Sequence, residues 1–193
     1  MKNLAIIVLT LLLTAGTGIH PGSAENWSPD KALLGQLAPE TSIGEFRIRP
    51  PKDSVVQEKP GPNDSMAYAW KGIKRPDGTS PYLMVLLSPV PEGESVPDPD
   101  KILQSFMRAV AKNREADWKS TSPETGTING INFIHAEWEG TDVATGKKMH
   151  GFMYVTIEGK DLIQISSQDV EPHHKAALKL AETAALTFHK IEK

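Results

Sequence analysis

The apolar residues in the last third of the chain form the clearest pattern in the sequence, and they predict a β-hairpin. Two runs rich in β-branched and aromatic residues, 149–157 and 162–167, flank Gly159-Lys160. A glycine at the first position of a two-residue loop suits a type II′ turn. That turn sets a register in which Tyr154 lies opposite Ile165. Both faces of the hairpin carry large apolar side chains, so we expect cover on both faces of the sheet.

Four further strands are predicted: those at 43–49, 66–70 and 131–139 from a two-residue period, and that at 82–88 from an unbroken apolar run. The first of them turns Phe46 and Ile48 inward, and we interpret it as an edge strand because two prolines stop it. The run at 82–88 is apolar on both faces, so we expect it near the middle of the sheet. Between the later strands, Asn129-Gly130 is typical of a type I′ turn.

Apolar residues at helical spacing predict two helices. The first begins at Pro99 with Asp98 as its N-cap, runs to about Ala116 and is expected to centre Phe106 on the sheet. The second begins near Pro172 and continues towards the C-terminus. These helices are the elements that we expect to cover the sheet.

The first residues have the composition of a signal peptide. Lys2 is followed by an apolar core at 4–13 and by small residues that end at Ala24. An uncleaved anchor is the alternative, but the apolar run is shorter than the about 20 residues that span a bilayer. The organisation that we expect is a signal peptide at 1–24, an extended lead-in at 25–42 and a single domain at 43–193.

The amino-acid composition limits the cellular compartments and the classes of partner that fit this protein. The 193 residues include no cysteine and carry a formal net charge of −3. Without cysteine the chain forms neither a disulfide nor a cysteine-linked lipid anchor. We therefore expect an exported protein, periplasmic or extracellular, with no stable membrane anchor after cleavage. A mildly acidic surface gives no electrostatic reason to bind nucleic acid.

Five segments carry a resemblance to a known family: 46–51, the helix at 101–116, the turn at 128–131, the hairpin at 152–166 and the closing helix. Together they resemble the PsbP-like family over roughly residues 43–188. The resemblance implies an α+β fold, an α/β/α sandwich with a central antiparallel β-sheet flanked by helices on both faces. It groups the chain with a photosystem II extrinsic subunit, a nuclear Ran-binding protein and periplasmic DcrB-like proteins, which mostly bind or assemble. The anchoring cysteine of the DcrB-like proteins is absent here, and the export signal excludes a nuclear role.

One group of residues is a candidate for chemistry. His135, Glu137 and Glu139 alternate onto one face of their strand, and His150 follows a polar loop. A histidine beside carboxylates is a candidate general base or metal ligand. The simplest hairpin register instead places His150 near Trp138 on the opposite face, and a polar row at a strand end is commonly solvated surface.

Other polar groups favour structural roles. His173 and His174 point roughly 100° apart on a helix, so they do not chelate one ion together. Four acidic residues at 92, 94, 98 and 100 surround a helix start, where capping by Asp98 explains them better than calcium does. Ser166-Ser167 continues a strand, and no nucleophile, phosphate-loop or zinc-protease motif is present in the sequence.

These observations predict a non-enzymatic binding or assembly module. We expect no catalytic residue, no cofactor and no metal, and a partner that is an unknown protein or small molecule of the cell envelope. The alternative is a hydrolase-type enzyme that uses a His/Glu site near His135, Glu137 and His150.

Overall fold

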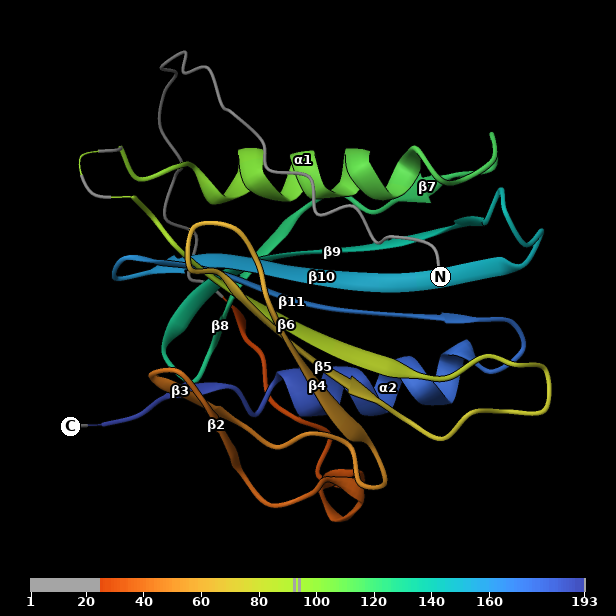
Figure 1. Ribbon diagram of the computed structural model, residues 1–193, viewed down its shortest axis with the longest axis horizontal. Helices are drawn as coiled ribbons and strands as arrows, with labels where there is room; N and C mark the ends of the chain where they lie inside the picture. Colours follow the sequence, from red (N-terminus) through yellow and green to blue (C-terminus); the bar gives the residue numbers. More distant parts are fainter. Residues whose placement is uncertain (1–24, 92, 94, 193) are drawn as a thin grey trace.

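The computed structural model describes residues 25–91, 93 and 95–192. The predicted signal peptide at 1–24 lies outside the described residues, as do Glu92 and Glu94. A nine-stranded sheet forms the body of the molecule, with one long helix on each side of it (Figure 1).

The large sheet is mixed. Its strands are β1 (Glu25–Asn26), β4 (Val55–Pro60), β5 (Met66–Lys71), β6 (Tyr82–Pro89), β7 (Lys119–Ser120), β8 (Glu124–Ile128), β9 (Ile131–Thr141), β10 (Lys148–Glu158) and β11 (Asp161–Val170). They lie in the order β1-β8-β9-β10-β11-β6-β5-β4, with β7 beside β9. The pairs are antiparallel apart from β1 and β8, which are parallel. The apolar strand β6 lies inside the sheet, between β11 and β5, as its sequence predicted.

A second sheet of three strands contains β2 (Thr41–Ile43), β3 (Phe46–Ile48) and β12 (His189–Lys190), with β3 in the middle. The single edge strand predicted at 43–49 is therefore wrong. Gly44 adopts a φ of 60°, a left-handed conformation that glycine tolerates, and it turns the chain into a hairpin at that point. Phe46 and Ile48 do point inward, with exposed fractions of 1% and 0%.

The helices are η1 (Leu34–Gln36), α1 (Pro99–Ala111) and α2 (His174–Ala185). Asp98 caps α1 as predicted, because its Oδ1 accepts a hydrogen bond from the Asp100 amide at 3.0 Å. The helix ends earlier than predicted because the chain leaves it to join the sheet, where the Glu115 amide donates to the Thr141 carbonyl at 2.9 Å. Within the described part of the chain, no helix combines the length and apolar character that crossing a membrane requires.

The predicted α/β/α sandwich with a central antiparallel sheet is wrong. Among the described residues, 44% lie in strands and 17% in helices, so the chain is mostly β. The helix α1 packs on β9 and β10, whereas α2 packs on β11, β10 and β6. On the α2 face much of the cover comes from the small sheet, whose Ile43, Phe46 and Ile48 join the same core cluster. Apolar side chains from a second sheet thus bury area that a helical layer was expected to bury.

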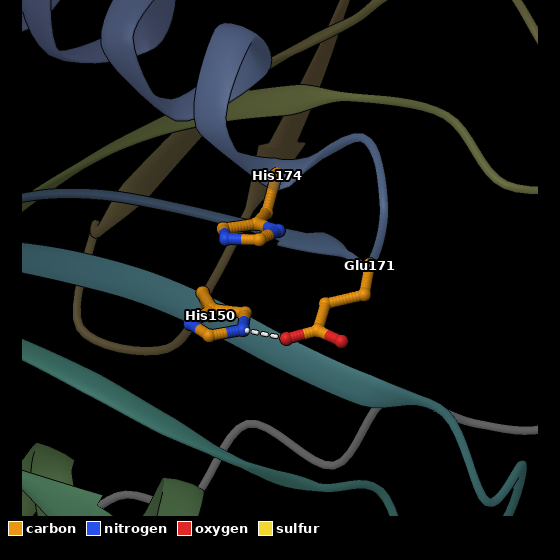
Figure 2. A group of neighbouring side chains, drawn as sticks. All are labelled: His150, Glu171 and His174. Atoms are coloured by element: carbon orange, nitrogen blue, oxygen red, sulfur yellow. Dashed lines mark hydrogen bonds and ion pairs between the residues drawn. The ribbon is translucent and has the colours of Figure 1, made fainter.

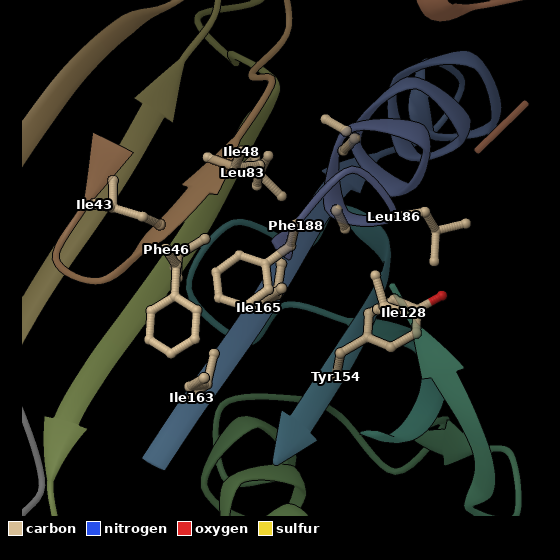
Figure 3. Close-up of a cluster of buried hydrophobic side chains, with 14 of the residues drawn as sticks. Ile43, Phe46, Ile48, Leu83, Ile128, Tyr154, Ile163, Ile165, Leu186 and Phe188 are labelled. Atoms are coloured by element: carbon tan, nitrogen blue, oxygen red, sulfur yellow. The ribbon is translucent and has the colours of Figure 1, made fainter. Parts of the chain in front are cut away.

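Two apolar clusters hold the sheet between these covers. On the α2 side, Phe46 stacks on Phe188 with ring centroids 4.9 Å apart, above Ile163 and Ile165 (Figure 3). On the α1 side, Leu103 is 1% exposed, while Phe106 packs at the margin and is only partly buried. The expectation that Phe106 is centred on the sheet is therefore wrong, and Leu103 is the more deeply buried residue.

Candidate functional site

A groove of about 540 Å³ runs between α2 and the adjacent ends of β7, β9 and β10. We call it the α2 groove. Its polar lining consists of Lys119, Ser120, Thr121, Glu137, Glu139, His150, His174, Lys175, Lys179 and Glu182. Histidines, carboxylates and lysines therefore gather on one concave surface, which makes this groove the first candidate for binding or chemistry.

The two walls of the groove match in direction and spacing. His174, Leu178 and Glu182 follow one another at four-residue intervals along one side of α2. Opposite them, β10 contributes His150 at one end, and the buried Tyr154 four residues later reaches Glu182 with its hydroxyl. Eight helical residues rise about 12 Å and four strand residues about 13 Å, so the groove has two ends with similar spacing on both walls.

At one end, His150, Glu171 and His174 form a group that we call the histidine-pair cluster (Figure 2). The two imidazole rings lie face to face, with centroids 3.8 Å apart and planes 11° apart. His150 Nε2 lies 2.8 Å from Glu171 Oε1, and one donor atom from each of the three residues lies within 4.8 Å of the others. Donors around a tetrahedral Zn²⁺ are about 3.4 Å apart, so these three donors are near the required spacing. The nitrogen lone pairs of stacked rings lie in nearly parallel planes, so the imidazoles would have to rotate out of the stack to bind one ion.

Burial and charge favour the neutral, ligand-competent form of one histidine. His174 Nδ1 is buried and has no hydrogen-bond partner within the described residues. Burial lowers the pKa of His174, and the neighbouring His150 lowers that pKa further. The hydrogen bond from His150 lowers the pKa of Glu171, which keeps this carboxylate ionised. A neutral imidazole and an ionised carboxylate are the forms that bind a metal.

Glu137 and Glu182 line the other end of the groove, and a donor atom of the buried His135 lies within 4.8 Å of a carboxylate oxygen of each. Tyr154 Oη donates a hydrogen bond to Glu182 Oε1 at 2.9 Å. Burial lowers the pKa of His135 to about 4. Burial raises the pKa of Glu182, and the nearby carboxylate of Glu137 raises it further, although the Tyr154 hydrogen bond acts against this shift.

The structure only partly brings together the residues singled out from the sequence. His150 pairs with Glu139, not with Trp138, so it lies on the same face as His135 and Glu137. The predicted placement near Trp138 on the opposite face is therefore wrong by one residue of register. His135 itself pairs with Tyr154, about 13 Å along β10 from His150, so the two histidines belong to different clusters.

Glu171 and the partnership of His174 with His150 were missed by the sequence reasoning. His173, the neighbour of His174, lines a different pocket of about 550 Å³ on another side of α2, together with Trp70 and Arg75. The prediction that His173 and His174 do not chelate together agrees with this divergence. Glu171 follows directly on β11, and no local pattern relates it to a histidine 21 residues earlier.

Ser166 and Ser167 continue β11 as predicted. Both are buried, and Ser167 Oγ donates to the Tyr82 carbonyl at 2.6 Å. The aromatic residues Trp70, Trp138 and Tyr154 are core residues with exposed fractions of 5% or less. These side chains therefore contribute to hydrogen bonding and packing within the sheet.

Comparison with known proteins shows the fold. No family model matches the sequence, and no curated protein matches it. Among solved structures, the chain is similar to the solution structure of cyanobacterial PsbP (CyanoP) from Synechocystis sp. PCC 6803, with a TM-score of 0.51 and 17% sequence identity. The match covers 92% of this chain and 98% of that one. The chain therefore has a PsbP-like fold, and at this identity the likeness concerns the fold alone.

Proposed function

We propose that the protein is an exported, non-enzymatic binding module whose α2 groove binds a divalent metal ion at the histidine-pair cluster. The observation that carries the proposal is the convergence of His150, Glu171 and His174 to within 4.8 Å, with a buried His174 Nδ1 that has no hydrogen-bond partner within the described residues. From the sequence we expected no metal site, and the proposal departs from that expectation.

Two imidazoles and one carboxylate form a donor set that suits Zn²⁺ and related transition ions. Three protein donors leave at least one coordination position for a ligand. Lys175 also lines the groove, so an anionic donor from a small molecule or protein of the cell envelope suits that position best. Export to the periplasm or the cell exterior, inferred from the first 24 residues, places the module where such ligands are encountered.

The test is calorimetric titration of the exported protein with Zn²⁺. We expect His150→Gln and His174→Gln each to weaken binding by about tenfold or more, because each variant removes one ligand from the ion. His173→Gln is the matched control: it changes the adjacent histidine, which lines the other pocket, and should leave the affinity unchanged.

Equal Zn²⁺ affinity in all three variants would contradict the proposed site. A parallel screen with ester, phosphoester, glycoside and peptide substrates addresses the enzyme alternative. Turnover by the wild-type protein that is lost in His150→Gln would favour the hydrolase instead of the binding module.

A further inference from the structure

A buried histidine next to the Glu137 and Glu182 end of the α2 groove has an unpartnered ring nitrogen among the described residues. His135 is 8% exposed, and its Nε2 is buried without a hydrogen-bond partner in the described part of the chain. An unpaired buried polar atom costs free energy, so its retention calls for an explanation such as a ligand. One donor atom of His135 lies within 4.8 Å of a carboxylate oxygen of Glu137 and of Glu182.

The same end of the groove concentrates negative charge. Besides Glu137 and Glu182, Glu124 pairs with His135 across β8 and β9. Two of the three lysines that line the groove make ion pairs with other carboxylates: Lys179 Nζ lies 2.8 Å from Asp30 Oδ2, and Lys119 Nζ lies 3.6 Å from Glu139 Oε1. Like charges this close repel one another, and a bound cation would remove that repulsion.

Aromatic residues hold the donors in place. Tyr154 stacks on His135 with ring centroids 4.3 Å apart, and Trp27 packs edge-on against His135 at 5.8 Å. The Tyr154 hydroxyl engages Oε1 of Glu182 and leaves Oε2 available to a second partner. Fixing one ligand through a hydrogen bond to its neighbour is how outer-shell residues orient metal ligands in proteins.

We propose that His135, Glu137 and Glu182 form a second divalent-metal site, separate from the histidine-pair cluster. One imidazole and two carboxylates suit a transition ion such as Zn²⁺ or Mn²⁺. The donors come from β9 and α2, so an ion there would also tie the helix to the sheet. The protein then binds two ions, about 13 Å apart along the groove.

The experiment isolates this site in a double variant, His150→Gln with His174→Gln, which removes the first cluster. Titration with Zn²⁺ should show about two ions bound to the wild-type protein and about one to the double variant. On that background, Glu137→Gln should weaken the remaining site by about tenfold or more. Glu124→Gln is the matched control, because it removes a neighbouring charge but no ligand, and it should change the affinity much less.

Trp27 provides a second measurement. A paramagnetic ion such as Co²⁺ at His135 should quench the fluorescence of this nearby indole, and Trp27→Phe should abolish that part of the signal while keeping Zn²⁺ affinity. Absence of Zn²⁺ binding in the double variant would overturn the second site while leaving the first intact. Equal losses of Zn²⁺ affinity in Glu137→Gln and Glu124→Gln would overturn the second site too. Such a result would show that the ion is held by general attraction to negative charge and not by specific ligands.

Discussion

The ion pair between Arg75 and Asp169 supports the segment that carries the histidine-pair cluster. Arg75 Nη1 and Nη2 donate to the two carboxylate oxygens of Asp169 at 2.7 and 2.6 Å. The Asp169 side chain is only 2% exposed, and that of Arg75 is 18% exposed. Asp169 lies opposite His150 in the sheet, two residues before Glu171. The pair therefore joins the β5–β6 connection to the strand end beside the proposed metal site.

The substitution Arg75→Met should be strongly destabilising. It removes two charge-assisted hydrogen bonds and leaves a buried carboxylate that, among the described residues, keeps a hydrogen bond from the Val170 amide, 2.8 Å from Oδ1. Breaking a buried pair from one side costs about 3–5 kcal/mol. A chain of this length loses about 2–4 °C of melting temperature per kcal/mol, so the midpoint should fall by roughly 6–20 °C.

Thermal and urea unfolding followed by circular dichroism measure this loss. Arg47→Met is the matched control, because Arg47 pairs with Glu40 at 3.6 Å and both side chains are about 45% exposed, a geometry worth less than about 1 kcal/mol. Adding Asp169→Leu to Arg75→Met should restore part of the stability, since no unpaired charge then remains buried. If Arg75→Met loses no more than Arg47→Met, the reasoning about the buried carboxylate is refuted.

Three further predictions concern the core, alkaline stability and processing. Leu103→Ala should cost about 2–5 kcal/mol of unfolding free energy and Phe106→Ala clearly less, because only Leu103 is fully buried; equal losses in urea unfolding would contradict this. Burial raises the pKa of Tyr82 to about 12, so its contribution to stability is complete below pH about 10 and is lost as the pH rises towards 12. Tyr82→Phe should flatten the dependence of the unfolding free energy on pH in that range. An unchanged dependence on pH would argue against the raised pKa of Tyr82. Mass spectrometry of the exported protein should find Glu25 at the N-terminus, whereas an intact Met1 would refute cleavage after Ala24.

The parts of the fold that depend on neighbouring residues could be predicted from the sequence. The β10–β11 hairpin has the predicted register, with Tyr154 opposite Ile165, because Gly159 adopts the positive φ that its turn requires. Asn129 and Gly130 likewise both have positive φ, as a type I′ turn demands. Turn chemistry determines register wherever the loop is two residues long.

The parts that depend on distant segments could not be predicted in the same way. The mixed character of the large sheet comes from β1, a two-residue strand that pairs in parallel with β8 about 100 residues later. The small sheet joins β3 to β12 across most of the chain. Neither pairing has a local signal, because two- and three-residue strands are too short to show a period. The fold class was wrong for this reason.

The candidate site depends on the register between β9 and β10, which is set by a loop longer than two residues. The connection between β9 and β10 spans residues 142–147, where the Asp142 amide donates to the Lys147 carbonyl at 2.9 Å and Asp142 Oδ1 accepts from the Thr145 amide at 3.0 Å. This loop sets Glu139 opposite His150. Moving the pairing by one residue would send His150 to the α1 face, away from His174. A side-chain hydrogen bond inside a polar loop thus decides whether the two histidines meet, and the apolar pattern of the strands does not contain that information.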